Sequence, residues 1–496
     1  MAIDFQGADI IVFPEDGIYG MYFPKRSLIF PFMEYMPDPG VHWNPCKQPG
    51  LYPDTDVQTY LSCMAKDNGL YVVANIGDVQ PCNRATDSKC PSDGRYQYNT
   101  NVVYDPDGLF ISKYHKYNLY YEVQFDTPDT CDMATFETPF GKFGMLTCFD
   151  ILFEKPSVTL VEEYNITDVV FPTAWMDAAP FLTSIQFHSS FALTHGVNFL
   201  SANIHRPEHR FRGSGVYTPE GGAAYYYSHE DGPGKLVVAE IPTLNRQAKL
   251  STATKRSDSS DNPHSHSSRV VDDGNDTFAI RMFKDYHNAV PLLDNQGSRL
   301  VCHTSLCCNV TYNLQSQSSN NMPSFDNEVN QPDVPEDKIF FALAAYDGLH
   351  KNARYYMQIC SIVKCLSTGG NIDCGYLDAK KNTYADTADF ENFSISGNFS
   401  TNYVYPQILL EGDPYLQLTD YPRQWTYSNG KLSSPKPYRK QLNAATLFGR
   451  DYQRDLQMPN RKVSTNGALV AGGTRLSLRG IFIKIVFALF SIILFV

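Results

Sequence analysis

Three side chains in this sequence have the chemistry needed to attack a carbonyl group: a thiol, a carboxylate and an ammonium. Cys148 ends the apolar run FGMLTC and precedes FDILFEKP, and Glu15 follows IIVFP. Lys116 lies in KYHKYNLYYE, with Glu122 six residues further on. The thiolate is the nucleophilic form of cysteine, and a nearby cation and base lower its pKa. The carboxylate could serve as that base, and the ammonium could stabilise a developing oxyanion.

Each residue also has an ordinary structural interpretation. A cysteine in an apolar run is usually a core residue or half of a disulfide, and a lysine among aromatic residues usually extends its charge to the surface. The arrangement favours chemistry, because each residue follows a predicted strand at its C-terminal end. A strand-to-helix turn at Cys148 would expose the thiol and direct the backbone N–H of Phe149 towards an oxyanion.

The elements expected to position these residues form an α/β layered domain over residues 1–250. The runs ADIIVF, LYVVANIG, FGMLTCFD, DVVFPTAW and FLSANI are predicted strands, several of them apolar throughout, as in strands covered on both faces. A hairpin is predicted over residues 101–116, with its turn at Pro106-Asp107-Gly108. Helical spacing occurs in DVQTYLSCMAKDN, FEKPSVTLVEEYN and LTSIQFHSSFALTHG.

The second half of the sequence has a different character. Residues 251–277 are polar without an apolar period, and we interpret them as a linker. His264 and His266 could suggest a metal site, but such a pair in a serine-rich loop is usually solvated. We therefore predict neither a metal nor a cofactor. Residues 278–460 contain runs such as KIFFALAAYDG and AATLFGRDYQRD, and they predict a strand-rich second domain.

Composition sets broad limits on function. The chain has 496 residues, of which 43% are hydrophobic, enough for two or three folded units. Its formal net charge of −12 argues against a nucleic-acid partner, because a phosphate-binding surface needs an excess of lysine and arginine. The sequence does not determine the oligomeric state, and a monomer is the simplest expectation.

The 12 cysteines are clustered, at Cys82 and Cys90, at Cys302, Cys307 and Cys308, and at Cys360, Cys365 and Cys374. Zinc is the alternative to disulfides, but the clusters lack paired CxxC spacing, and two adjacent cysteines suit two disulfides better. Disulfides indicate an oxidising compartment. Glycosylation sequons support the same compartment and occur at Asn165, Asn275, Asn309, Asn392 and Asn398.

The C-terminal segment, residues 464–496, has the layout of a glycosylphosphatidylinositol (GPI) attachment signal. Small residues and a polar spacer precede an apolar run of 16 residues from Ile481 to Val496. That run contains Lys484 and is short for a membrane-spanning helix of about 20 residues. Asn466 is the preferred attachment residue, which would place the protein at the extracellular face of the plasma membrane.

The order of the segments PED, HKxNL and TCFD resembles the Glu, Lys, Cys order of the carbon–nitrogen hydrolase (nitrilase) superfamily. DGRYQYNTNVVYD, FGMLTCFDIL, FPTAWM, GSGVYTP, FSISGNFSTNYV and LFGRDYQRD look like its biotinidase and vanin (pantetheinase) branch. The resemblance runs from about Asp9 to Asp455. It implies an α-β-β-α sandwich with a strand-rich second domain, and hydrolysis of a linear non-peptide amide.

Roles follow from the resemblance at matching positions. Cys148 would be the nucleophile, Glu15 the general base, and Lys116 the oxyanion stabiliser together with the Phe149 amide, while Glu122 would orient the lysine. Cys148 must then stay reduced. Eleven other cysteines remain, an odd number, so at least one more lacks an intramolecular partner, and the isolated Cys131 is our candidate.

The substrate is left open between pantetheine and a biotinyl amide such as biocytin. Trp175, Met176 and His205 are expected to line the acyl pocket, although ordinary packing at a strand end would explain them equally well. A second hypothesis is a non-catalytic, GPI-anchored adhesion protein that keeps the fold. A cysteine protease would need a histidine base, and His115 beside Lys116 does not fit the motif.

The sequence departs from the family pattern at its N-terminus. It begins almost directly with a buried strand, where a signal peptide would be expected. The first strand and first long helix of the family are also missing. We expect a longer product with a signal peptide upstream of Met1, and reduced stability of the chain as written, since a lost strand exposes a sheet edge.

Overall fold

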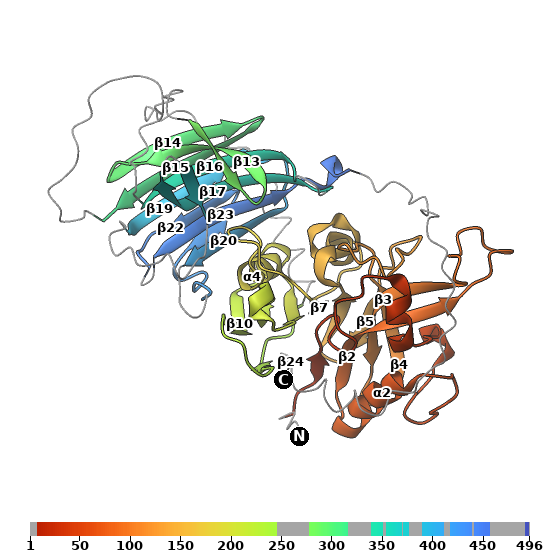
Figure 1. Cartoon of the computed structure of the whole chain (residues 1–496). Helices are drawn as coiled ribbons and strands as arrows, with labels where there is room; N and C mark the ends of the chain where they lie inside the picture. Colours follow the sequence, from red (N-terminus) through yellow and green to blue (C-terminus); the bar gives the residue numbers. More distant parts are fainter. Residues whose placement is uncertain are drawn as a thin grey trace.

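The computed structural model (Figure 1) describes residues 7–245, 277–315, 339–350, 354–369, 371–375, 389–410, 417–438, 441–456 and 492–495. The predicted glycosylation site Asn275 and attachment site Asn466 lie outside these residues, as do His264 and His266, which we predicted to be solvated. The chain forms two units, coloured red to yellow and green to blue in Figure 1.

The first unit contains two six-stranded sheets. One has the order β11-β24-β1-β2-β3-β4, and the other has the order β10-β9-β8-β7-β6-β5. The strands of the first are β1 (Ile10–Val12), β2 (Tyr71–Pro81), β3 (Arg95–Tyr104), β4 (Phe110–His115), β11 (Leu236–Ala239) and β24 (Ile492–Phe495). Those of the second are β5 (Thr135–Thr138), β6 (Gly141–Met145), β7 (Asp168–Thr173), β8 (Asn198–Asn203), β9 (Ser214–Thr218) and β10 (Gly221–Tyr226).

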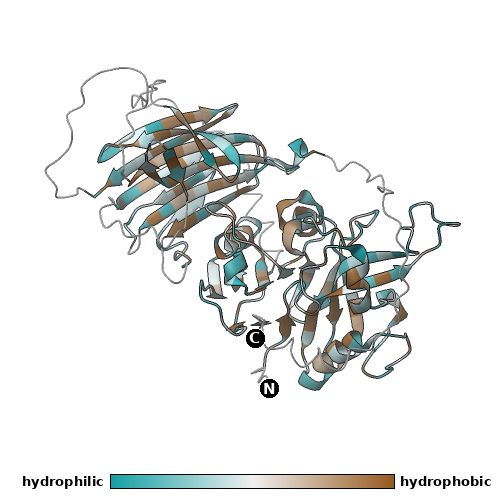
Figure 2. Cartoon of the chain, in the orientation of Figure 1, coloured by the Kyte–Doolittle hydropathy of each residue, from teal (hydrophilic) through white to brown (hydrophobic). Residues whose placement is uncertain are grey.

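The two sheets pack face to face through a shared apolar core. Val12, Val73 and Val103 of the first sheet pack with Met145 and Val170 of the second. The outer faces of the sheets are covered by helices, and they are apolar as well. Strand β7, for example, is buried along its whole length. Figure 2 shows the resulting apolar residues along the strands of both units. The predicted α-β-β-α sandwich is confirmed.

Helices α2 (Asp56–Asn68) and α4 (Ser184–His195) match two of the predicted helical segments. The third predicted segment is divided between η4 (Glu154–Val158) and α3 (Thr159–Glu162). Shorter helical turns are α1 (Arg26–Ile29), η1 (Phe30–Phe32), η2 (Pro39–Val41), η3 (Cys148–Leu152), η5 (Pro207–His209) and η6 (Tyr452–Arg454). The predicted hairpin is β3 and β4, and Gly108 in its turn has φ of 81°, a left-handed conformation that glycine adopts without strain.

The second unit is a sandwich of two further sheets. The larger sheet has the order β12-β13-β16-β17-β23-β20 with β18 paired to β17, and the smaller has the order β14-β15-β19-β22-β21. Its strands are β12 (Phe278–Met282), β13 (Asp285–Leu292), β14 (Gln296–His303), β15 (Leu306–Leu314), β16 (Ile339–Leu349), β17 (Tyr356–Thr368), β18 (Asn371–Cys374), β19 (Phe390–Gly397), β20 (Val404–Leu410), β21 (Thr426–Ser428), β22 (Lys431–Ser434) and β23 (Leu442–Arg450).

Helix α4 is the layer where the two units meet. Phe187 and Phe191 of α4 belong to one apolar cluster with Ala344 of β16 and Phe448 of β23. The rings of Phe187 and Phe448 lie 5.7 Å apart, centre to centre. Because α4 packs between two sheets, eight of its 12 residues are buried, including polar side chains such as Gln186 and His188. The second unit is therefore fixed to the first by a continuous core.

Five disulfides connect Cys46 with Cys63, Cys82 with Cys90, Cys302 with Cys307, Cys308 with Cys360, and Cys365 with Cys374. The adjacent cysteines at positions 307 and 308 thus form two separate bridges, as predicted. Cys131 and Cys148 are the two free thiols, which confirms both expectations.

Strand β24 comes from the apolar run assigned to the attachment signal. It lies between β1, to which it is antiparallel, and β11, to which it is parallel. In this arrangement β1 has a hydrogen-bonded neighbour on both sides, so the edge expected beside it is covered. Across the described ranges, no helix combines the length and apolar character needed to cross a membrane.

Asp168, at the start of β7, allows a test of core electrostatics. Burial raises the pKa of this carboxyl from 3.8 to about 6. The folded state therefore binds its proton more tightly than the unfolded chain, and this contribution to stability is lost as the pH rises through about 6. Asp168→Asn, which keeps the shape, should gain about 1.4 kcal/mol of stability relative to the wild type on going from pH 5 to pH 8, because pH 5 lies about one unit below the folded-state pKa. Thermal unfolding of both proteins at the two pH values measures this, and an equal difference at both would contradict it.

Candidate active site

Cys148 is held in an unusual backbone conformation. It is the first residue of η3, three residues after β6 ends, and its φ is 47°. A left-handed conformation is costly for a residue with a side chain and requires support from its surroundings. Asp150 supplies part of that support, because its Oδ2 accepts a hydrogen bond from the Thr147 N–H at 3.2 Å. The predicted strand-to-helix turn is confirmed, but the predicted exposure of the thiol is wrong, because Cys148 is buried, at 8% exposure.

Asp150 also holds the loop that carries Lys116. Its Oδ2 accepts a hydrogen bond from the Tyr114 hydroxyl at 2.7 Å, and its Oδ1 accepts from the backbone N–H and the side-chain Nδ2 of Asn118, both at 2.9 Å. One buried carboxylate therefore joins the cysteine turn to the end of β4. Its pKa is raised to about 6, chiefly by burial.

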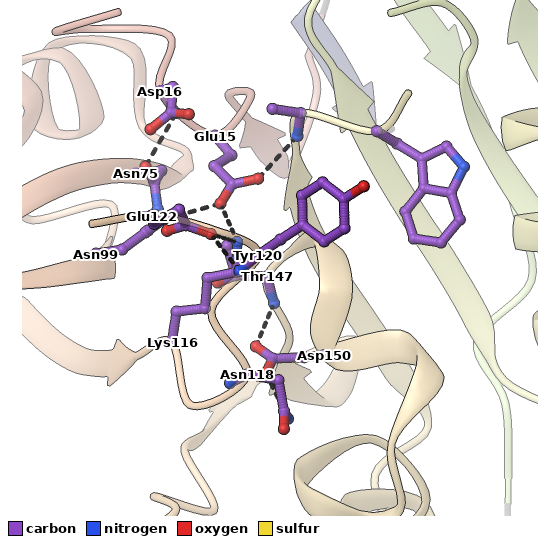
Figure 3. Close-up of polar contacts among 12 residues, drawn as sticks. Glu15, Asp16, Asn75, Asn99, Lys116, Asn118, Tyr120, Glu122, Thr147 and Asp150 are labelled. Atoms are coloured by element: carbon purple, nitrogen blue, oxygen red, sulfur yellow. Dashed lines mark hydrogen bonds and ion pairs between the residues drawn. The ribbon is translucent and has the colours of Figure 1, made fainter. Parts of the chain in front are cut away.

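Lys116, Glu15 and Glu122 form a buried ion cluster (Figure 3). The Lys116 Nζ lies 2.7 Å from Glu15 Oε1 and also forms an ion pair with Glu122 Oε1. Lys116 and Glu15 are almost inaccessible to solvent, at 2% and 1% exposure. The second oxygen of Glu15 accepts a hydrogen bond from the Ala174 N–H at 2.9 Å, immediately after β7. The structure thus brings together the three residues predicted from PED and KYHKYNLYYE.

A chain of asparagines behind this cluster was not found from the sequence. Asn99 Nδ2 donates to Glu15 Oε1 at 2.8 Å and to Glu122 Oε2 at 2.9 Å. Asn99 Oδ1 in turn accepts from Asn75 Nδ2 at 2.6 Å. An amide group has a donor end and an acceptor end. These hydrogen bonds therefore fix the orientation of the Asn99 amide, with its Nδ2 directed towards the two carboxylates. The only signal in the sequence was an asparagine inside each of the runs VVANIG and YQYNTN.

Electrostatics within the cluster depend on burial and on the two carboxylates. Burial alone would lower the pKa of Lys116, but Glu122 and Glu15 outweigh it and hold that pKa well above its usual range. Burial raises the pKa of Glu122 despite the lysine. Asp16 beside Glu15 also has its pKa raised well above the usual value, by burial and then by Glu15, so it favours the neutral form.

The Cys148 thiol differs from the sequence-based expectation of a lowered pKa. Burial, and then the charge of Glu15, raise its pKa well above the usual value, and Lys116 only partly opposes them. The expectation was wrong because it counted the cation without burial, which is the largest cause, and without the charge of Glu15. The resting thiol therefore keeps its proton, and a base must remove it when the sulfur attacks.

A cavity of about 1000 Å³ contains the thiol and the ion cluster. Trp175 and Met176, two of the three residues expected in the acyl pocket, line this cavity, and Phe149 lines it as well. The second unit also contributes to the wall, through Phe283, Lys284, His350, Tyr355 and Gly375. A pocket of this size accommodates a small-molecule amide and leaves space beyond it.

The structure does not bring His205 into this cavity lining. Its Nε2 lies 3.0 Å from the Glu230 carbonyl oxygen, and its ring packs against Tyr226. The sequence placed it correctly after β8 but could not show that the next loop covers it. His115 does not line the cavity either. Its Nε2 lies 2.8 Å from Asp78 Oδ2, and its ring stacks on Tyr98.

The described sequon asparagines differ in accessibility. Asn165 and Asn398 are exposed, while Asn309 and Asn392 are half-buried. The Asn398 side chain forms hydrogen bonds with the backbone of Ser305 and Cys307.

Among the residues described, no group of three or more His, Cys, Asp or Glu side chains is arranged to hold a metal ion.

The role of Asp150 as a link between two loops gives a pH prediction. As the pH falls through about 6, the carboxylate gains a proton and loses an acceptor position, so kcat should fall. The protein should not unfold there for this reason, because a raised carboxyl pKa favours the folded state at acid pH. Asp150→Asn should lower kcat at pH 7.5 roughly tenfold to a hundredfold and remove this pH-dependent component.

Profiles of kcat from pH 5 to pH 8 for wild type and Asp150→Asn, with thermal midpoints at each pH, provide the measurement. An unchanged acid limb in the variant would contradict the assignment.

Comparison with known proteins gives two family matches. The carbon–nitrogen hydrolase model matches residues 2–171, and the Vanin C-terminal domain model matches residues 277–455. The chain is 42% identical over 452 residues to a pantetheinase of Canis lupus familiaris, covering 91% of this chain and 80% of that protein. It is 42% identical over 455 residues to a Homo sapiens pantetheinase, covering 91% and 81%. It is 37% identical over 480 residues to a Mus musculus biotinidase, covering 92% and 86%.

Proposed function

The chain belongs to the carbon–nitrogen hydrolase superfamily, in its pantetheinase and biotinidase branch, and we propose that it cleaves pantetheine with Cys148 as nucleophile. As a member of this branch it is a thiol-dependent hydrolase of amide C–N bonds. Pantetheine is preferred to a biotinyl amide because the identity is 38% to 42% to the pantetheine hydrolases and 37% to the biotinidases. The observation that carries the catalytic assignment is the buried Lys116 cluster in the same cavity as a free thiol.

Acylation begins with a neutral thiol. Its proton passes from Sγ to a Glu15 oxygen as the sulfur attacks the amide carbonyl carbon. The carbonyl oxygen becomes an oxyanion, which the Lys116 ammonium and the Phe149 N–H stabilise. When the C–N bond breaks, the leaving amine takes the proton from Glu15, and the acyl group remains on the sulfur as a thioester.

Deacylation uses the same groups in reverse. Glu15 removes a proton from water, the resulting hydroxide attacks the thioester, and the acid leaves as the thiol regains its proton. Glu122 and Asn99 hold Lys116 and Glu15 in place in both steps. Because Glu15 bonds Lys116, Asn99 and the Ala174 amide at once, its carboxylate keeps one orientation through both steps.

Replacing the nucleophile tests the assignment. Cys148→Ala should lower kcat/KM for pantetheine by at least roughly a thousandfold, since no other thiol can form the acyl intermediate. Cys131→Ser is the matched control, because it removes the other free thiol and should leave turnover unchanged. Cysteamine release from pantetheine, measured beside lysine release from biotinyl-lysine, identifies the substrate.

Activity that persists in Cys148→Ala would refute the nucleophile. Faster cleavage of biotinyl-lysine than of pantetheine would instead assign the protein to biotinidase-like chemistry and keep the nucleophile.

We also propose that the protein is held at the extracellular surface through a GPI anchor at Asn466. The support is the segment of small residues, polar spacer and apolar run over residues 464–496. Attachment removes the residues that follow Asn466, so the pairing of β24 described above belongs to the chain before processing. When the chain is expressed behind a secretory signal peptide, phosphatidylinositol-specific phospholipase C should release the processed protein from transfected cells. A variant cut before Ser464 should appear in the medium without the enzyme. Protein that stays on cells after phospholipase treatment would contradict the anchor.

A further inference from the structure

Arg450, the last residue of β23, is a fully buried arginine with an unusually complete set of contacts. Its Nη2 and Nη1 lie 2.6 and 3.1 Å from the two carboxylate oxygens of Asp455. Its Nη1 also donates to the Tyr356 carbonyl, and the guanidinium lies over the rings of Tyr355 and Tyr452, at 5.0 and 4.7 Å. All of these partners belong to the second unit.

One nitrogen of Arg450 reaches the first unit. Its Nε donates to the Leu152 carbonyl oxygen at 2.9 Å, across 298 positions in the sequence. Leu152 is the last residue of η3, the helical turn that Cys148 begins. The carbonyls at the end of a helical turn lack partners within the turn, so an external donor there fixes the position of the whole turn.

The ring of Tyr355 packs against side chains of the same turn. Its ring lies 6.2 Å from the ring of Phe149 and 6.2 Å from the ring of Phe153. Tyr355 also lines the cavity and stacks on His350. The second unit therefore contacts the segment 148–153 at its backbone end through Arg450 and at its side chains through Tyr355.

The geometry points to Arg450 as a positioning residue for the nucleophile. By holding the Leu152 carbonyl, it fixes the turn on which the Cys148 sulfur and the Phe149 N–H must face the same carbonyl group of the substrate. The second unit then contributes to catalysis without touching the reacting atoms. This inference rests on the proposed function only in taking Cys148 as the nucleophile.

Arg454 provides a matched control within the same segment. It also lies over a tyrosine ring, that of Tyr356, at 3.7 Å, and it forms an ion pair with Asp347 at 3.5 Å. Both of these partners belong to the second unit. The two arginines therefore share residue type, stacking and ion pairing. They differ in the bond to the cysteine turn and in burial, because Arg450 is fully buried and the Arg454 side chain is 42% exposed, so Arg454→Lys controls for stacking and ion pairing.

Arg450→Lys keeps the charge and can pair with Asp455, but a single ammonium cannot also replace the Nε bond to Leu152. We expect kcat on pantetheine to fall roughly tenfold to a hundredfold with little change in KM, as a small displacement of reacting groups does. Asp455→Asn, at a partly exposed position, should give a smaller fall in kcat by loosening Arg450. Arg454→Lys should keep wild-type kcat.

The rate of iodoacetamide alkylation, followed separately on the Cys148 and Cys131 peptides, separates positioning from unfolding. Misplacement of the turn away from Glu15 should slow Cys148 alone and leave Cys131 at the wild-type rate. Unchanged kcat in folded Arg450→Lys, or an equal loss in Arg454→Lys, would overturn the inference. So would faster alkylation of both thiols in Arg450→Lys and Asp455→Asn, since this would show a purely structural role. Activity in Cys148→Ala would refute the nucleophile itself, a separate result.

Discussion

Lys116 keeps its charge in the protein interior because Glu15 and Glu122 bind its ammonium group from two sides. Removing an ion from water costs several kcal/mol, and only close counter-charges and complete hydrogen bonding offset it. With both carboxylates ionised, the cluster has a net charge of −1, so it does not stabilise a resting thiolate. The same cluster that prepares the base therefore keeps the Cys148 proton in place until a substrate arrives.

This cluster requires the ends of strands from two sheets to meet. Glu15 and Lys116 follow β1 and β4 of the first sheet, whereas Cys148 follows β6 of the second. Polar bonds join the sheets at this edge, from the Ala174 N–H to Glu15, from Tyr114 to Asp150 and from Asn101 Nδ2 to the Leu146 carbonyl. The apolar core sets the distance between the two sheets. These hydrogen bonds fix the position of one sheet relative to the other at the site.

Local patterns in the sequence predicted the elements and the order of the reactive residues. The alternation of apolar runs and helical spacing identified α2, α4 and the strands, and the free thiols followed from the cysteine count. The Asn99 and Asn75 chain could not be predicted, because an asparagine in a strand does not reveal its cross-strand partner. The predicted direction of the Cys148 pKa shift was wrong. Burial, which the local sequence does not report, raises this pKa by more than the lysine lowers it.

Long-range packing accounts for what the sequence missed in the second unit. Nothing near Arg450 in LFGRDYQRD indicates that its Nε meets the carbonyl of Leu152, since 298 positions separate them. The same holds for Tyr355, just before β17, and for Phe283, in the turn between β12 and β13, which line the cavity from a part of the chain that the sequence assigned only to a strand-rich domain. The prediction that His205 lines the pocket was wrong for a different reason. A position directly after a strand does not establish that the side chain faces the site.

The central claim is that an acyl group passes through the sulfur of Cys148. Acid quenching of the enzyme during turnover of pantetheine, followed by mass analysis of its peptides, tests this directly. The account predicts a mass increase equal to the pantothenoyl group on the peptide that contains Cys148, and none on the peptide that contains Cys131. An acyl group on any other peptide, or turnover with Cys148 never modified, would contradict it.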